Sequence, residues 1–160
     1  MKVQDVMQPN VLCVDQSMSV RDLYAELQAS EIAGAPVLDE NDYLVGVVSL
    51  TDIARCVAGD ENEENPYYYG GMDVAVPTIK SNEIDKQKTV RDIMNQRVHK
   101  VNGSAEVEEA LEIMVDEDVH RVIVTHRSHV VGIITAGDMM RLFLEMLSDD
   151  TDDNLDDNEE

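Results

Sequence analysis

The sequence is poor in aromatic and basic residues, and each shortage excludes a class of protein. Aromatic residues make up 4% of the 160 positions and tryptophan is absent, so a core built from the 43% of hydrophobic residues must be aliphatic. Lysine and arginine number 12 against 34 aspartates and glutamates, which gives a formal net charge of -22. Because nucleic acids and anionic lipids bind through basic patches, a chain this acidic is not expected to bind either of them.

Cysteines and long apolar runs are also scarce. Cys13 and Cys56 are far apart and form no CxxC pair, which is typical of a reducing cytoplasm and not of a disulfide framework. No apolar run approaches the roughly 18 residues of a membrane span, and residues 1–5 lack the apolar stretch of a secretory signal. We therefore expect a cytoplasmic protein without a membrane-inserted segment.

What the chain does contain is an internal repeat. Asp5-Val6-Met7 recurs 87 residues later as Asp92-Ile93-Met94, and the heptad GVVSLTD at 46–52 recurs 86 residues later as GIITAGD at 132–138. A shared order of features over about 50 residues is much stronger evidence of a repeat architecture than any single motif.

Each copy shows the same succession of patterns. In the second copy the apolar residues from Val107 to Val115 recur at helical spacing, and Ser104 before them is a candidate N-cap. In the first copy Ser17 or Ser19 takes that place before Val20. The expected elements are extended pieces at 11–14 and 98–101, helices beginning near 20 and 107, strands at 35–38, 44–48, 122–124 and 130–134, and helices at 51–58 and 136–147. The strands are continuous apolar runs, so we expect them to be buried on both faces. The predicted fold class is α/β (α+β), a β-α-β-β-α unit that occurs twice.

The two G-h-h-(S/T)-x-x-D heptads, each closing the third strand of its unit, give the chain a family resemblance. It resembles a tandem pair of cystathionine-beta-synthase (CBS) domains, the arrangement called a Bateman module, in its stand-alone form. The resemblance covers residues 1–58 and 89–147, which leaves a linker at 59–88 and an acidic tail at 148–160 that we expect to be disordered. It implies that the two repeats pack sheet to sheet about a pseudo-twofold axis, and that two chains associate as a homodimer.

The resemblance also implies a function. Family members bind adenosine derivatives such as AMP, ADP, ATP, NAD or S-adenosylmethionine in clefts between the repeats. We therefore expect a regulatory nucleotide-sensing protein, not an enzyme, which requires no cofactor or metal and modulates a partner enzyme or transporter. The few bases favour a monophosphate or an uncharged adenosyl group over a polyphosphate. The alternative is a protein–protein interaction module with non-functional nucleotide clefts.

By the same resemblance, specific residues are expected to bind the ligand. The carboxylate of each heptad would receive the ribose hydroxyls, and the hydroxyl three residues earlier would contact ribose or phosphate. This suits a carboxylate, which accepts charge-assisted hydrogen bonds, and a hydroxyl beside a helix N-terminus, where anions are favoured. These residues are Ser49 and Asp52 in the first copy and Thr135 and Asp138 in the second. The adenine would be enclosed by the start of the second strand of the opposite repeat, so that Ile32, Ala33 and Gly34 face Asp138, and Val119, His120 and Arg121 face Asp52.

Structural alternatives stay open for these residues. Asp52 and Asp138 equally suit the first turn of a helix, where aspartate is a common cap. His120 and Arg121 equally suit a surface that offsets the acidic body. The tyrosine-rich part of the linker is either a strap over the sheets or a docking segment. The last helix carries more apolar surface than one packing face needs, and we expect a dimer contact through Met139, Met140, Leu142, Phe143, Met146 and Leu147.

Overall fold

The computed structural model describes residues 1–59, 79–80 and 82–152 of the chain. In chain order the elements are α1 (Val3–Val6), β1 (Val14–Asp15), α2 (Val20–Ala29), β2 (Gly34–Leu38), β3 (Leu44–Ser49), α3 (Leu50–Ala58), α4 (Val90–Ile93), β4 (Lys100–Asn102), α5 (Val107–Asp116), β5 (Arg121–His126), β6 (His129–Thr135) and α6 (Ala136–Asp152). They form two three-stranded sheets with the orders β1-β2-β3 and β4-β5-β6. In each sheet the first pair of strands is parallel and the second is antiparallel.

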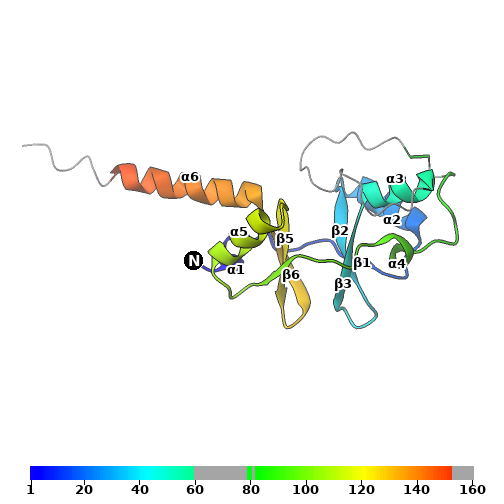
Figure 1. Ribbon diagram of the computed structural model, residues 1–160, viewed down its shortest axis with the longest axis horizontal. Helices are drawn as coiled ribbons and strands as arrows, with labels where there is room; N and C mark the ends of the chain where they lie inside the picture. The colour runs from blue at the N-terminus through cyan, green and yellow to red at the C-terminus, as the bar shows by residue number, and fades with distance from the viewer. Residues whose placement is uncertain (60–78, 81, 153–160) are drawn as a thin grey trace, which may run out of the picture.

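The two sheets stand next to each other at the centre of the molecule, with the helices on their outer sides (Figure 1). The mixed α/β class and the paired repeats expected from the sequence are therefore confirmed. Burial on both faces is clearest for β5, whose four central residues are buried, whereas β6 alternates between buried and partly exposed positions. The extended pieces join their sheets later than predicted, at Val14 and Lys100.

The helix starts obey local hydrogen-bond rules, with one correction. The Ser19 hydroxyl accepts from the backbone N–H of Asp22, so Ser19 caps α2 as one of the two predicted alternatives. Ser104 does not cap α5, since the N-cap is Glu106. The backbone N–H and the hydroxyl of Ser104 both donate to the side-chain oxygen of Asn102, which closes a turn before the helix.

Two short helices that the sequence patterns did not predict, α1 and α4, are exchanged between the repeats. Figure 1 shows α1 beside α5 of the second repeat and α4 beside the helices of the first. The backbone N–H of Val3 donates to the carbonyl of Ala105, and that of Val90 donates to the carbonyl of Met18. Val3 is thereby buried in the core of the second repeat and Val90 in the core of the first. Neither core is complete without a segment from the other repeat.

This exchange explains the glycine that opens each heptad. After α1 the chain pairs with β6 through Gln8 and Ile133, and after α4 it pairs with β3 through Asn95 and Val47. A Cβ atom on Gly132 would lie 2.9 Å from the Gln8 carbonyl oxygen. The heptad glycines are therefore required by the close approach of a crossing backbone.

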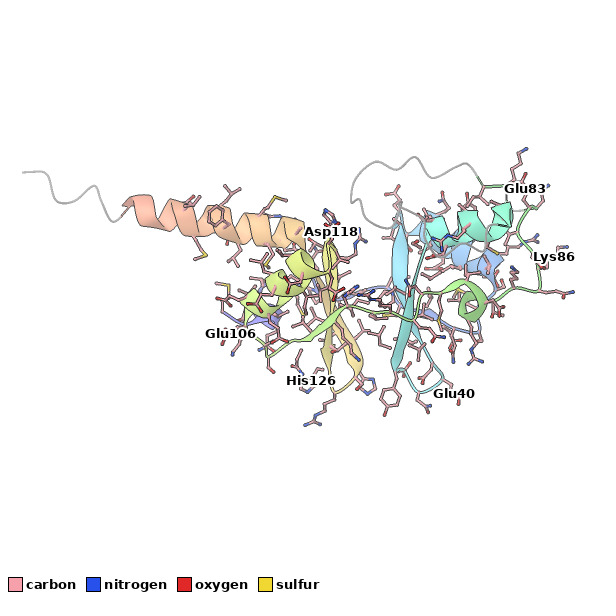
Figure 2. The ribbon with its side chains drawn as sticks, viewed as in Figure 1. Glu40, Glu83, Lys86, Glu106, Asp118 and His126 are labelled. Atoms are coloured by element: carbon pink, nitrogen blue, oxygen red, sulfur yellow. The ribbon has the colours of Figure 1, made fainter. Side chains whose placement is uncertain are left out.

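The hairpins that end the two sheets lie on one edge of the molecule, as Glu40 and His126 mark in Figure 2. Tyr43 stacks on His129 with ring centroids 5.2 Å apart. The Nδ1 atom of His129 lies 3.2 Å from the Asp42 carbonyl oxygen, to which the Nδ1-protonated ring donates. The repeats therefore also contact each other at their hairpin tips.

The boundaries of the predicted linker and tail fall partly outside the described residues. The tyrosines at 67–69 and residues 153–160 lie outside the described residues. The two hypotheses for the tyrosine-rich segment, a strap over the sheets or a docking segment, therefore stay predictions. Ile79 and Ile84, at the end of the predicted linker, are buried against the first repeat. Helix α6 continues to Asp152, five residues beyond its predicted end, and projects from the body in Figure 1. None of the described helices is both long and apolar enough to span a membrane.

Candidate functional site

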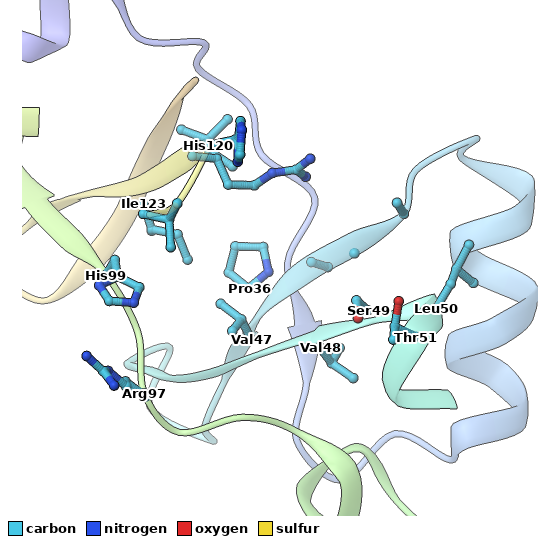
Figure 3. Close-up of a pocket in the computed structure, with 16 residues that line it drawn as sticks. Pro36, Val47, Val48, Ser49, Leu50, Thr51, Arg97, His99, His120 and Ile123 are labelled. Carbon is cyan, nitrogen blue, oxygen red and sulfur yellow. The ribbon is translucent and has the colours of Figure 1, made fainter. Parts of the chain in front are cut away.

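A cavity of about 280 Å³ lies between the two repeats. This volume is close to the lower end of the range for small-molecule sites, roughly 300–1,000 Å³. Its wall is formed by Ala33, Gly34, Ala35, Pro36, Val47, Val48, Ser49, Leu50, Thr51, Arg97, His99, Val119, His120, Arg121, Ile123 and Ile133. Figure 3 shows Ser49 and Thr51 at the start of α3 on one side, and His99 and His120 on the other.

Six of the ten residues singled out from the sequence line this cavity. They are Ala33, Gly34, Ser49, Val119, His120 and Arg121. Ile32, Asp52, Thr135 and Asp138 are not among the lining residues. The cavity thus brings together residues of both repeats.

The cavity brings the predicted adenine-facing residues of both repeats beside the first heptad. Val119, His120 and Arg121 line it opposite Ser49, and that Ala33 and Gly34 face Asp138 stays a prediction. Ala33 and Gly34 also line the cavity together with Ser49 of their own repeat. The reason is the antiparallel register of β2 and β3, which pairs Gly34 directly with Ser49. The backbone N–H of Leu50 also donates to the Ala33 carbonyl over 2.8 Å. The start of the second strand is therefore always beside the heptad of its own repeat.

Arg97 and His99 are cavity residues that the sequence analysis missed. They lie between α4 and β4, in the stretch where the chain crosses from the first repeat back to the second. The sequence of this stretch predicts only an extended segment and gives no sign of a binding site. The stretch reaches the cavity because α4 packs on the first repeat. Arg97 forms an ion pair of 2.5 Å with Glu117, and both side chains are largely exposed.

The charge of the cavity wall contrasts with that of the chain. The lining residues include two arginines and two histidines. No aspartate or glutamate is among the described residues that line the cavity. In a chain with 34 acids and 12 lysines and arginines, this is a local concentration of basic groups. Such a wall favours an anionic ligand group, for which arginine supplies several donors in a planar fork.

The two heptad aspartates both lie in the first turn of a helix and accept hydrogen bonds from the residue three positions earlier, which for Asp52 is the N-cap Ser49. One oxygen of Asp52 accepts from the backbone N–H and the hydroxyl of Ser49, over 2.8 and 2.9 Å. One oxygen of Asp138 accepts in the same way from Thr135, over 2.9 and 2.7 Å. The structural alternative for these residues therefore describes part of their role.

Burial separates the heptad aspartates from other helix-start aspartates of the chain. Thr89 and Asp92 form the same hydrogen bonds at the start of α4, so the S/T-x-x-D pattern alone does not identify a ligand site. Asp92 is exposed, whereas Asp52 and Asp138 are 3% and 7% exposed. Burying a carboxylate is costly unless donors compensate it, and helix capping does not require that burial. The Asp52 carboxylate accepts a hydrogen bond from the hydroxyl of Ser49, which lines the cavity.

The electrostatic states of the two carboxylates differ. Burial raises the pKa of Asp52, and the hydrogen bonds from Ser49 and the Arg55 charge oppose this only in part. Burial also raises the pKa of Asp138, but hydrogen bonds from Thr135 and Gln8 outweigh it, so that the pKa is lowered overall. The side-chain amide of Gln8 donates to both oxygens of Asp138, over 3.0 and 3.2 Å. Two positions that are equivalent in the repeat are thus chemically distinct.

The described part of the chain contains no cluster of three or more histidine, cysteine or acidic side chains that could hold a metal ion. The groups able to contact a ligand at the cavity are instead hydroxyls, basic side chains and backbone atoms, with a buried carboxylate behind them.

Comparisons with known proteins agree with this geometry. The family model of the CBS domain matches residues 3–59 and 90–145. Protein MJ1426 of Methanocaldococcus jannaschii is 23% identical over 155 residues, which cover 90% of this chain and 92% of that protein. The chloroplastic CBS domain-containing protein CBSX2 of Arabidopsis thaliana is 30% identical over 156 residues. The match covers 90% of this chain and 64% of CBSX2.

Two solved structures have the same fold. The structure of CBSX2 in complex with AMP superposes with a TM-score of 0.66 at 28% identity, covering 91% of this chain and 97% of that one. The CBS domain pair of protein MJ0100, in complex with 5′-methylthioadenosine and S-adenosyl-L-methionine, superposes with a TM-score of 0.65 at 22% identity, covering 91% and 98%. Since both repeats match the family model and two sheets enclose a cavity beside their heptads, this chain belongs to the CBS domain family as a tandem pair.

Proposed function

We propose that this protein binds an adenosine-containing ligand in the cavity between its repeats. The proposed contacts are the Asp52 carboxylate with the ribose hydroxyls, the hydroxyls of Ser49 and Thr51 with ribose or phosphate, and the backbone at Ala33 and Gly34 with the base. The observation that carries the proposal is the buried Asp52 carboxylate, which is hydrogen-bonded to Ser49 in the wall of a cavity made by both repeats. The AMP complex of the relative CBSX2 supports the choice of ligand class.

The proposed role of binding is regulatory and not catalytic. Because the cavity wall comes from both repeats, a ligand that contacts both walls favours the relative orientation in which they fit it. The hairpin-tip contact between Tyr43 and His129 would then respond to the same change. We propose that a partner enzyme or transporter reads this orientation. The cytoplasmic location expected from the sequence stays a prediction.

A thermal-shift series with AMP, ADP, ATP, NAD and S-adenosylmethionine tests the binding proposal. A ligand that binds only the folded state adds about 2.7 kcal/mol of stability at a hundredfold excess over its Kd. For a chain of this size, each kcal/mol raises the Tm by roughly 2–4 °C, so a shift of about 5–10 °C is expected. No shift at millimolar concentration of any of the five compounds would contradict the proposal.

A pair of variants separates ligand contact from helix capping. Asp52→Ala and Asp92→Ala each remove the carboxylate that accepts from the hydroxyl and N–H at a helix start. Of these two carboxylates, only that of Asp52 is hydrogen-bonded to a residue of the cavity wall, Ser49. Asp52→Ala should weaken binding by about 10- to 150-fold, since hydrogen bonds to charged groups are worth about 1.5–3 kcal/mol. Asp92→Ala should leave the Kd unchanged, and equal effects of both variants would show that Asp52 acts only as a cap.

A protein-contact role has its own supporting observation. Helix α6 carries apolar side chains that are about 50–60% exposed, at Met140, Phe143, Leu144, Met146 and Leu147. An exposed apolar stripe of this kind is typical of a protein interface. We propose that it is the homodimer contact. Four of the six residues expected there belong to it, whereas Met139 packs against the core of the second repeat and Leu142 is partly buried. If no adenosine ligand binds, this stripe supports the alternative of a pure interaction module.

A further inference from the structure

Gln8 makes the surroundings of the two heptad aspartates chemically different. It follows α1 and lies where the N-terminal segment pairs with β6 of the second repeat. Its side-chain amide donates to both carboxylate oxygens of Asp138, over 3.0 and 3.2 Å. Those two oxygens are the acceptors that a ribose diol would need. A ligand diol at this position must therefore displace an intramolecular donor.

The equivalent residue in the other repeat, Asn95, behaves differently. It lies 87 residues after Gln8, but its side-chain oxygen accepts from the backbone N–H of Arg97 over 2.8 Å. Among the described residues, only Ser49 donates a hydrogen bond to the Asp52 carboxylate. The other oxygen of Asp52 has Arg55 at 3.6 Å as its nearest ionic partner. Asp52 is thus a buried carboxylate with acceptor capacity left for a diol.

The basic residues of the cavity are confined to one repeat. Arg97, His99, His120 and Arg121 correspond, 87 residues earlier, to Asn10, Leu12, Ala33 and Gly34. The chain segment that crosses beside the Asp52 heptad therefore supplies Arg97 and His99. The segment that crosses beside the Asp138 heptad supplies Asn10 and Leu12 at the equivalent positions. An anionic group has basic neighbours from the crossing segment only in the cavity beside Asp52.

We infer that each chain binds one nucleoside phosphate, in the cavity beside Asp52, and that Gln8 closes the equivalent position beside Asp138. The inference rests on the proposed function and narrows its ligand to a molecule with a ribose diol and a phosphate. Gln8 is the specificity-determining residue beside Asp138, because its side-chain amide donates to both carboxylate oxygens that a ribose diol would need. A sulfonium nucleoside such as S-adenosylmethionine, which carries a positive charge, fits the basic wall poorly.

Calorimetry with AMP on the full chain tests the stoichiometry. The wild-type protein should bind one AMP per chain, and Gln8→Ala should bind two. In the double variant Gln8→Ala/Asp52→Ala one site should persist, whereas Asp52→Ala alone should bind at least tenfold more weakly than wild type. Asn95→Ala is the matched control, since it truncates the equivalent amide without touching either carboxylate, and it should keep one site. A wild-type stoichiometry of two, or a Gln8→Ala variant that still binds one AMP at millimolar concentration, would overturn the inference.

The phosphate subsite has its own pair of variants. Arg121 lines the cavity at the start of β5, and Arg127 lies just beyond the other end of the same strand. Arg121→Gln should raise the Kd for AMP by about tenfold or more and leave the Kd for adenosine unchanged. Arg127→Gln should change neither. Equal affinity of the wild-type protein for AMP, adenosine and S-adenosylmethionine would refute the phosphate assignment.

A measurement without ligand keeps the Gln8 assignment separable from the proposed function. If no nucleotide binds the wild-type protein, the proposed function fails, but the state of Asp138 can still be read by carbon NMR of its carboxyl group. Removing the Gln8 amide should raise the pKa of Asp138, because that hydrogen bond holds it down. Asn95→Ala should leave the Asp138 titration unchanged. An unchanged Asp138 titration in Gln8→Ala would show that the amide does not occupy the carboxylate.

Discussion

Replacing Gly132 by alanine is expected to disturb the crossing of the N-terminal segment over β6. A Cβ atom at this position would overlap the Sδ of Met7 and lie 2.9 Å from the carbonyl oxygen of Gln8. The thioether can move aside, because methionine is flexible. The carbonyl cannot, since it accepts from the Ile133 N–H over 3.0 Å while the Gln8 N–H donates to the Ile133 carbonyl over 2.8 Å. The strain must therefore displace the segment or break this pair.

The magnitude follows from the cost of overpacking a close contact, about 1–3 kcal/mol. For a chain of this size that corresponds to a Tm lowered by roughly 2–12 °C. Gly137→Ala is the matched control in the same heptad. Its Cβ would lie 3.5 Å from the Thr135 hydroxyl, an ordinary contact, and alanine in a helix is favoured over glycine by up to about 1 kcal/mol. Gly137→Ala should therefore be neutral or stabilising.

Urea unfolding followed by far-ultraviolet circular dichroism suits this comparison, because the chain has no tryptophan. Protein concentration should be held constant, since dimerisation would make the midpoint depend on it. The expected order of stability is Gly137→Ala at or above wild type, and Gly132→Ala below it. If Gly132→Ala is as stable as wild type, the crossing segment does not press on β6, and the explanation offered for the heptad glycine is wrong.

The remaining predictions concern the two buried carboxylates and α6. Burial raises the pKa of Asp52, so its ionisation destabilises the fold as pH rises above about 4. Asp52→Asn should therefore unfold at higher urea than wild type at pH 7, with the gain vanishing near pH 3; parallel pH profiles would contradict this. For Asp138, burial is outweighed by the hydrogen bonds from Thr135 and Gln8, so its lowered pKa stabilises the fold above about pH 4. Asp138→Asn should be less stable than wild type at pH 7, and a loss of stability that persists below the folded-state pKa would refute the assignment. Phe143→Asp should give monomers in analytical ultracentrifugation, and an unaltered mass would exclude α6 as the dimer contact.

The order of helices and strands was largely predictable, because it depends on patterns that are local in the sequence. The repeat of the heptads and the apolar periods placed both sheets and four of the helices with boundaries wrong by a few residues. Ser19 as a cap follows the same local logic. The wrong prediction that Ser104 caps α5 also has a local cause. The hydroxyl and N–H of Ser104 both donate to the side chain of Asn102, two residues earlier.

The shape of the candidate site depended on contacts between distant segments, which no period or spacing encodes. Gln8 and Asp138 are 130 residues apart, and their hydrogen bond exists only because α1 packs on the second repeat. Arg97 and His99 reach the cavity for the corresponding reason, since α4 packs on the first repeat and the chain must cross back. Local patterns in the chain therefore specify two similar units with a heptad each. Which segment crosses which heptad depends on backbone pairing and core burial between distant residues, and these contacts exist only in the folded protein.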